Sequence, residues 1–217
     1  QPAYSTTIEA GFKSMLTDTS LLTAAVFQTG TRNEIVSAGS VNGRTSYRNA
    51  GRTRRTGFEL SYHNSWGQHW RADLAYTWLN ARYEDDCISG PCSNPDQPEQ
   101  YLQAGNRIPG IAQHAVFASL GWTPPNGWRA GVEGRFLGNI AVNDGNTESA
   151  SSYAVFALTT GYTWLAEAWE VSAFGRLDNV FDKDYAGSVI VNEGNGRYYE
   201  PAPGRNWTLG VQARFMF

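Results

Sequence analysis

The stretch Trp207-Thr-Leu-Gly-Val-Gln-Ala-Arg-Phe-Met-Phe217 decides the fold. Taken at every second position, it separates into an apolar row, Trp207, Leu209, Val211, Ala213, Phe215 and Phe217, and a mostly polar row, Thr208, Gly210, Gln212, Arg214 and Met216. Such strict alternation is typical of a β-strand between two different environments. Its length also matches the roughly 9–11 residues that a tilted strand needs to cross a bilayer. We therefore expect a membrane-spanning strand with lipid on one side and a polar lumen on the other.

Alternation of this kind recurs along the chain and predicts nine strands. The segments are 4–16, 21–36, 45–64, 69–84, 107–123, 128–142, 152–164, 169–185 and 204–217. Short connections lie at 17–20, 65–68, 124–127 and 165–168, and long ones at 37–44, 85–106, 143–151 and 186–203. Because short and long connections alternate, the segments should form antiparallel hairpins, with the short turns at the periplasmic rim and the long loops outside. The sequence therefore predicts an all-β fold, an antiparallel up-and-down transmembrane β-barrel.

Tryptophan placement supports this arrangement independently. Three of the four short turns are flanked by tryptophan pairs, which are Trp66 and Trp70, Trp122 and Trp128, and Trp164 and Trp169. Trp78 and Trp207 should lie at the opposite interface, about 20 Å higher at roughly 3.3 Å per residue and a tilt near 40°. The alternative, a soluble β-sandwich, has no reason to gather tryptophan at one end.

The charges on the predicted strands fall on one parity, which indicates a wet lumen. The lipid-facing rows should be Trp70, Ala72, Leu74, Tyr76 and Trp78; Trp128, Ala130, Val132 and Phe136; and Phe156, Leu158, Tyr162 and Trp164. The matching lumen rows should hold Arg71, Asp73, Ala75 and Thr77, and Arg129, Glu133 and Arg135. The stretch from Leu21 to Phe27 is apolar at both parities, so its faces stay unassigned.

Composition narrows the function classes. The chain has 217 residues and a formal net charge of −3, which favours neither nucleic acid nor an acidic substrate as a partner. No apolar run reaches the roughly 18 residues of a transmembrane helix. Cys87 and Cys92 enclose a short polar segment, and we interpret them as a disulfide formed in an oxidising compartment. The alternative, a metal site, lacks the further ligands of a tetrahedral set.

Four stretches carry more specific patterns: Thr7-Ile-Glu-Ala-Gly-Phe-Lys13, Asn49-Ala-Gly-Arg-Thr-Arg-Arg-Thr-Gly-Phe-Glu59, Leu177-Asp-Asn-Val-Phe-Asp-Lys-Asp-Tyr185 and Tyr198-Tyr-Glu-Pro-Ala-Pro-Gly-Arg205. In this order they resemble signatures of TonB-dependent outer-membrane receptors. The resemblance implies energy-coupled uptake of a ferric siderophore or similar metal chelate across the bacterial outer membrane, with a plug domain that contacts the TonB complex. It also implies that Phe217 is the terminal aromatic residue read by the barrel-assembly machinery.

Nine strands are too few for a complete receptor wall. Transporters of this size class have about 22 strands and a plugged lumen. An odd number of up-and-down strands also does not close with both ends in the periplasm. We therefore expect residues 1–217 to be the carboxyl-terminal portion of the barrel, with the plug domain absent. A sheet with two open edges should aggregate in water.

The candidates for ligand binding are arginine and tyrosine side chains near the outer mouth. The last loop offers Arg197, Tyr198, Tyr199 and Arg205, and the third segment, running inward from its loop, offers Arg44, Tyr47, Arg48 and Arg52 to Arg55. Guanidinium and phenol groups suit the anionic oxygens of an iron chelate. The alternative partners of the same arginines are lipopolysaccharide phosphates and neighbouring loops.

We expect no enzymatic activity, no cofactor and no resident metal. The three histidines fall on different predicted elements, and no nucleophile or zinc motif is present. Asp178, Asp182 and Asp184 lack the glycine and the spacing of a calcium-binding loop. The alternative function is a small self-contained outer-membrane barrel enzyme, a protease or lipid hydrolase, which would need a catalytic set at the rim.

Overall fold

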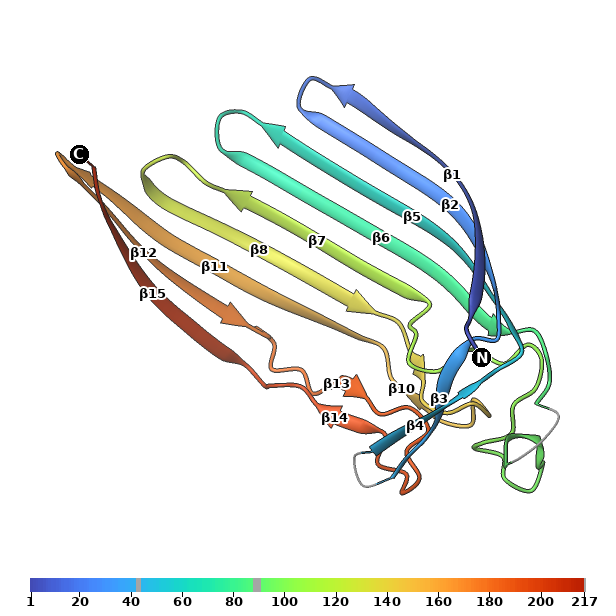
Figure 1. Cartoon of the computed structure of the whole chain (residues 1–217). Coiled ribbons are helices and arrows are strands. Elements are labelled where there is room, and N and C mark those ends of the chain that lie inside the picture. The colour runs from blue at the N-terminus through green and yellow to red at the C-terminus, as the bar shows by residue number, and fades with distance from the viewer. Residues whose placement is uncertain (42–43, 88–90, 217) are drawn as a thin grey trace.

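Most of the chain folds into one curved antiparallel sheet (Figure 1). The structure is a computed structural model that describes residues 1–41, 44–87 and 91–216. The strands of the sheet are β1 (Tyr4–Thr17), β2 (Ser20–Arg32), β5 (Arg52–Trp66), β6 (Trp70–Tyr83), β7 (His114–Trp122), β8 (Gly127–Leu137), β11 (Tyr153–Ala166), β12 (Trp169–Asp178) and β15 (Asn206–Phe215). Their order in the sheet follows their order in the chain. The prediction of nine antiparallel up-and-down strands is confirmed.

Short turns and long connections gather at opposite ends of the sheet (Figure 1). Tight turns join β1 to β2, β5 to β6, β7 to β8 and β11 to β12, where the sequence predicted them. The long connections contain short hairpins that the sequence analysis missed: β3 (Ile35–Val41) with β4 (Arg44–Asn49), β9 (Ile140–Ala141) with β10 (Ser149–Ala150), and β13 (Ala186–Val189) with β14 (Tyr199–Pro201). A 3-10 helix, η1 (Pro91–Ser93), lies between β6 and β7. Within the described ranges, no helix is long and apolar enough to cross a membrane.

Several predicted segments were too long at the loop end. β2 stops before Asn33, whose φ of 55° turns the chain away from the sheet. β12 likewise stops before Asn179, which has a φ of 49°. The predicted segment 45–64 is two elements, because its first residues form β4 in a separate hairpin and β5 begins only at Arg52.

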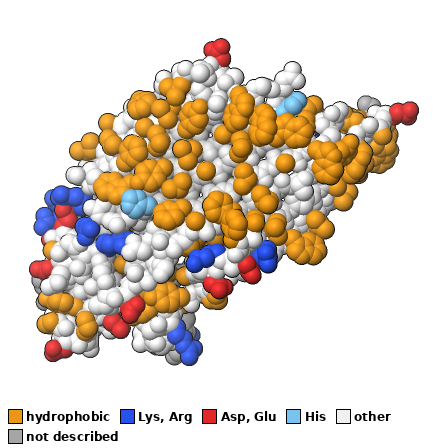
Figure 2. Space-filling model, turned by 180° about the vertical axis from the view of Figure 1, so that it is seen from behind, with side chains coloured by type: hydrophobic (Ala, Val, Ile, Leu, Met, Phe, Trp, Pro, Cys, Tyr) orange, Lys and Arg blue, Asp and Glu red, His pale blue; other side chains and the backbone are white. Residues whose placement is uncertain are grey.

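The register of the sheet agrees with the predicted faces. Cross-strand partners place Leu120, Val132, Leu158 and Leu177 in one row over four strands. On β15, Leu209 and Val211 belong to the same side and are 69% and 76% exposed. Figure 2 shows this side, here called the apolar face, as a field of hydrophobic side chains. The opposite side, here called the polar face, carries the charged residues of the predicted lumen rows.

The register also orients β2, which the sequence left unassigned. Val26 pairs with Phe58 of β5, and Phe58 pairs with Trp78, so Val26 belongs to the apolar face. Phe27 therefore belongs to the polar face, where its ring covers Gly57 so closely that an added Cβ there would lie 2.2 Å from Phe27 Cζ. β2 is therefore apolar at both parities for two different reasons. Val26 is exposed on the apolar face, and the Phe27 ring packs over a glycine on the polar face.

Aromatic side chains form two bands on the apolar face. At the short-turn end, the rings of Trp66 and Trp70 stack with 5.9 Å between their centroids, and those of Trp169 and Phe215 lie 5.0 Å apart. Trp207 pairs with Leu177, which lies eight residues after Trp169 on β12. Trp78 likewise lies eight residues after Trp70 on β6. Trp78 and Trp207 therefore share the second level, as expected.

Most of the buried core lies in the long connections and at the loop end of β6, because a single sheet has no second layer to pack against. One cluster contains Val36, Ala50, Ala81, Tyr83, Cys92, Leu102 and Ile108, and another contains Val142, Ala150 and Tyr198. The segments 33–51, 84–113, 138–152 and 179–205 thus pack together, and we call them the loop cap. The cap gives the open end of the sheet a defined structure above the polar face.

Candidate ligand-binding surface

An ion-paired arginine crosses the polar face between β8 and β12. Arg176 donates to the two carboxylate oxygens of Glu133 at 3.0 and 2.8 Å, and its Nε donates to Asp178 at 2.9 Å. β11 lies between these strands, and the small side chain of Ala157 opposite Glu133 leaves room for the pair to meet. Because a bidentate arginine–carboxylate pair fixes both groups, this part of the wall is rigid, and the charge of Arg176 is neutralised within the sheet.

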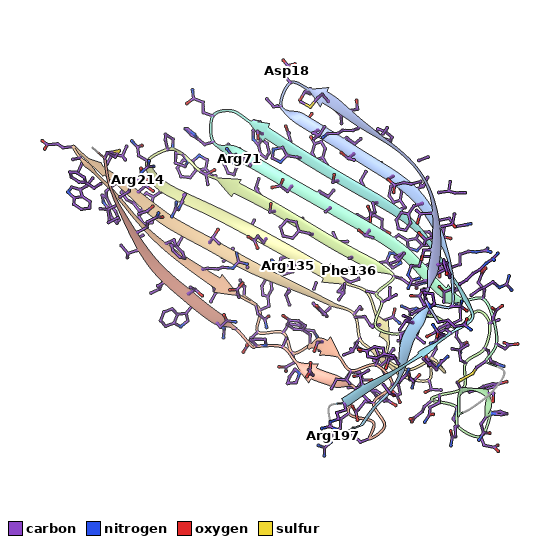
Figure 3. All side chains as sticks on the ribbon, viewed as in Figure 1. Asp18, Arg71, Arg135, Phe136, Arg197 and Arg214 are labelled. Carbon is purple, nitrogen blue, oxygen red and sulfur yellow. A yellow bond between two sulfur atoms is a disulfide. The ribbon has the colours of Figure 1, made fainter. Side chains whose placement is uncertain are left out.

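A hollow beside this pair ends under the loop cap, and Arg135 is its most exposed cation, with its guanidinium 3.8 Å from Glu133 Oε2. The hollow is lined by Glu133, Arg135, Arg176, Asp178, Asn179 and Tyr185, among others. The Arg135 side chain is 64% exposed and lies over the Phe117 ring, 5.8 Å from its centroid (labelled in Figure 3). At the cap side, the rings of Tyr185 and Tyr153 are 4.2 Å apart. An open guanidinium near two phenols can hold the anionic oxygens of a chelate.

Arg135, Tyr153 and Tyr185 were not among the predicted ligand residues. The sequence placed Arg135 in a lumen row but gave no reason to prefer it over Arg129 or Arg71. Tyr185 closes the quoted Leu177–Tyr185 stretch, and only the folded chain brings it onto Tyr153. Their grouping depends on register, which sets the face and the height of each side chain.

A second polar group joins β5, β6 and β7 near the short turns. His63 Nδ1 lies 2.7 Å from Asp73 Oδ1, and Ser119 donates to Asp73 Oδ2 at 3.1 Å. Ser65 Oγ lies 3.4 Å from His63 Nε2, so a serine, a histidine and an aspartate stand in line. His63 and Asp73 are about half exposed, 47% and 49%, so water screens this group and the serine is not activated by a dry pocket. Sequence reasoning missed the group, although His63 and Asp73 face each other across the predicted turn at 65–68.

The structure separates the residues predicted in the last loop. Arg197 is exposed at the tip of the loop cap (Figure 3). Tyr199 is 45% exposed and donates to the Ser149 carbonyl at 3.2 Å. Tyr198 is 4% exposed and donates to Glu99 at 3.0 Å, and burial raises the pKa of its phenol. Tyr198 is therefore part of the cap core, whereas Arg197 and Tyr199 are open to a ligand.

The two candidates on β4 also differ. Tyr47 is 69% exposed at the surface of the cap. Arg48 donates to Asp144 at 3.0 Å, and this buried carboxylate also accepts hydrogen bonds from the Tyr83 hydroxyl at 2.8 Å and from Asn192 at 3.0 Å. Arg48 thus braces neighbouring loops, which was the alternative role considered for it.

Arg205 is part of a hydrogen-bonded connection between the chain after β12 and the chain before β15. Its backbone N–H donates to Asp182 Oδ1 at 2.7 Å, and its guanidinium lies 4.0 Å from Asp182 Oδ2. Asn179 donates to the carbonyls of Lys183 and Pro203 at 2.9 and 3.4 Å. These residues come from the third and fourth stretches quoted above, so those stretches set the geometry of the last two strand ends.

The remaining predicted residues lie at the edges of the described structure. Cys87 and Cys92 are joined by a disulfide with their Cα atoms 5.7 Å apart, and Cys92 is part of the cap core. Phe217 lies outside the described residues. In the part of the chain that the structure describes, no group of three or more His, Cys, Asp or Glu side chains is arranged to hold a metal ion.

Sequence comparisons match this chain to TonB-dependent receptors. A family model described as "TonB dependent receptor-like, beta-barrel" matches residues 1–180. The "Probable TonB-dependent siderophore receptor PiuA" of Acinetobacter baumannii is 27% identical over 225 residues, covering 99% of this chain and 27% of that protein. The chain therefore spans about a quarter of the length of this curated relative.

Solved structures show the same fold. The crystal structure of PiuA aligns with a TM-score of 0.73 at 23% identity, over 96% of this chain and 28% of that one. The ferric citrate transporter FecA aligns with a TM-score of 0.74 at 17% identity, over 97% and 31%. The copper transporter OprC aligns with a TM-score of 0.68 at 20% identity, over 100% and 32%. The cargoes named in these titles differ, so likeness of fold does not select among them.

Proposed function

Because this chain belongs to the TonB-dependent receptor family, we propose that it works as part of an outer-membrane receptor that binds and imports a ferric siderophore or a similar metal chelate. The observation that carries the proposal is the two-sided sheet, apolar on one face and charged on the other, with a structured loop cap at one end. In an outer-membrane barrel, the apolar face would meet lipid and the polar face would line the lumen.

The ligand class follows from the open cations and phenols. Arg197, Tyr199 and Tyr47 are exposed on the cap, and Arg135 with Tyr185 lies in the hollow below it. An anionic iron chelate would meet the cap residues first and the hollow second. The paired arginines Arg48 and Arg205 position the loops instead.

Energy coupling would run through a plug domain that contacts the TonB complex, since residues 1–217 form wall and loops. Outer-membrane lipid and lipopolysaccharide would be the partners of the apolar face. The Cys87–Cys92 bridge suits an oxidising compartment. The relatives are named as receptors and transporters, which supports transport and gives no support to the enzymatic alternative.

Two double variants of the full-length receptor test the ligand surface. We expect Arg135→Ala with Tyr185→Ala, and separately Arg197→Ala with Tyr199→Ala, to weaken binding of an anionic ferric chelate roughly tenfold or more, since a hydrogen bond to a charged group contributes about 1.5–3 kcal/mol. Arg214→Ala is the matched control, because Arg214 lies on the polar face at the short-turn end (Figure 3). Affinity would be measured by quenching of intrinsic fluorescence.

Normal affinity in both double variants, with normal amounts of receptor in the outer membrane, would contradict this ligand surface. Loss of affinity in Arg214→Ala to the same extent would show a general effect of charge rather than a site. A receptor that takes up no metal chelate of any class would contradict the transport function itself.

A further inference from the structure

Arginine side chains border the apolar face where it meets the loop cap. Cross-strand partners place Arg32 opposite Arg52 and Arg54 opposite Arg82, and an isolated bridge sets Arg107 opposite Arg82. Arg32, Arg52, Arg54 and Arg82 share the side of Val26, Phe58 and Trp78, and Arg107 is opposite Arg82, so all five belong to the apolar face. At the loop end of the sheet the charges therefore do not keep to the single parity that the sequence predicted. Figure 2 shows basic side chains, with a few acidic ones, along this border of the hydrophobic field.

Two of these arginines are neutralised within the chain. Arg52 donates to Asp85 at 2.7 Å, and Arg54 forms an ion pair with Glu84. Glu84 and Asp85, the first two of the three acidic residues that follow β6, are thus already occupied, and Asp86 accepts a hydrogen bond from the Ala104 backbone N–H at 2.7 Å. Any further cation at this border needs its counter-charge from elsewhere.

Arg82 and Arg107 are hydrogen-bonded only to neutral groups among the described residues. Arg82 donates to Asn80 Oδ1 at 2.8 Å and to the Gly105 carbonyl. Arg107 donates to the amide oxygen and the carbonyl of Asn139, at 3.4 and 2.9 Å, and to the Ile111 carbonyl at 3.3 Å. Partial burial and the neighbouring Arg82 both lower the pKa of Arg107. Two like charges held together in this way favour an anion between them.

The height of this pair on the sheet identifies the kind of anion. Arg82 follows the girdle residue Trp78 by four positions, which is about 10 Å farther from the membrane centre at roughly 3.3 Å per residue and a tilt near 40°. That is the level of lipid headgroups. The apolar field continues directly below, with Tyr76 stacked on His114, so one molecule with phosphates and acyl chains can cover both surfaces.

We propose that Arg82 and Arg107 bind the phosphate groups of a phosphorylated lipid of the outer leaflet. The inference rests on the outer-membrane location in the proposed function. Guanidinium groups bind phosphate oxygens in a bidentate manner, and a lipid phosphate supplies the counter-charge that the chain does not. The lipid would brace the loop segment that carries Arg107 against β6 and β8.

The test uses the full-length receptor, purified in a non-ionic detergent and titrated with bisphosphorylated lipid A. We expect saturable binding by the wild type and at least a roughly tenfold loss in Arg82→Gln with Arg107→Gln. Arg82→Lys with Arg107→Lys keeps the charges and should retain most of the affinity. Arg71→Gln with Arg129→Gln removes the same charge from the polar face and should change nothing.

Three results would overturn the proposal. They are unchanged lipid affinity in the double glutamine variant, equal affinity of the wild type for lipid A without phosphates, and binding of inorganic phosphate as tight as that of the lipid. The second and third need only the wild type, so they decide the matter even if the variant fails to fold. Chelate binding should be normal in the glutamine variant. A wild type that binds lipid A but no metal chelate would count against the transport function and not against the lipid site.

Discussion

Val211 and Gln212 are neighbours in β15 with opposite environments. Val211 is 76% exposed on the apolar face beside Ala173, and Gln212 pairs with Ser172 on the polar face. A side chain on the apolar face of a membrane strand must be compatible with hydrocarbon, whereas the neighbouring position must tolerate water. Each position along β15 is therefore restricted to one class of residue.

Substitution by arginine tests this difference directly. In the full-length receptor we expect Val211→Arg to reduce assembly in the outer membrane, because a charge at the bilayer midplane costs roughly 2–4 kcal/mol. Gln212→Arg should assemble at near wild-type levels, since its side chain reaches the lumen. Immunoblots of outer-membrane fractions, with and without heating, measure assembly. Equal behaviour of the two variants, or the reverse order, would mean that the faces are assigned wrongly.

Close packing on the polar face gives a second residue-level prediction. An added Cβ at Gly210 would lie 2.3 Å from Phe174 Cε1, whereas nothing lies within 4 Å of a Cβ added at Gly30. Gly210→Ala should therefore destabilise the receptor by about 1–3 kcal/mol through overpacking, and Gly30→Ala should leave it unchanged or slightly more stable. The thermal midpoints of both purified variants decide the point. A similar shift in both would exclude the Phe174 ring as the cause.

Single residues differ in how far their environment was predictable. The period of two assigned Val211 and Arg71 to their faces, because alternation is a local property of a strand. Tyr198 and Tyr199 are adjacent in the last long connection, where the sequence shows no such period, and their exposure depends on contacts with Glu99 and Ser149 far away in the sequence. The sequence therefore predicted the wall of the site but not which loop residues stay open.

At the scale of elements, Glu34 closes the base of the β3–β4 hairpin against the sheet. Its carboxylate accepts hydrogen bonds from Arg55 at 2.9 and 3.0 Å and from the Thr53 hydroxyl at 2.8 Å. Its carbonyl accepts from the Ala50 backbone N–H at 2.7 Å. The sequence analysis missed this hairpin because alternation continues on both sides of the base. Residues 35–36 were assigned to the strand before and 45–49 to the strand after.

The carboxylate makes the hairpin sensitive to acid. Burial raises the pKa of Glu34, but hydrogen bonds from Arg55 and Thr53 lower it by more, so the net pKa lies below the ordinary value of 4.5. A depressed pKa contributes stability that is complete above the unfolded-state value and is lost as pH falls through the folded-state value. The difference in thermal midpoint between wild type and Glu34→Gln should therefore be constant near neutral pH and shrink below pH 4.5. A difference that does not shrink as the pH falls below 4.5, or that disappears above pH 6, would contradict this assignment.

At the scale of the whole molecule, one buried carboxylate connects loops that are distant in sequence. Asp144 follows β9, and its partners Arg48, Tyr83 and Asn192 come from the first loop hairpin, the end of β6 and the last loop. Backbone hydrogen bonds add to this connection, since Ser40 N donates to the Asn192 carbonyl at 3.0 Å. The predicted long loops are therefore one packed unit. Sequence alone could not reveal this, because its contacts join separate connections.

Removing the carboxylate should loosen the loop cap as a unit while leaving the sheet intact. In the full-length receptor, Asp144→Ala leaves Arg48 without its partner, and breaking a buried pair costs about 3–5 kcal/mol. Hydrogen exchange should then accelerate by roughly a hundredfold or more at the amides of Ser40 and Asn192, because local opening is limited by the free energy of those contacts. Amides in the middle of β11 and β12 should exchange as before. Asp96→Ala is the matched control, since Asp96 is an exposed acid in the same cap. Faster exchange confined to residues next to position 144 would mean that the loops open independently, and the cap would then not hold Arg197 and Tyr199 in place for a ligand.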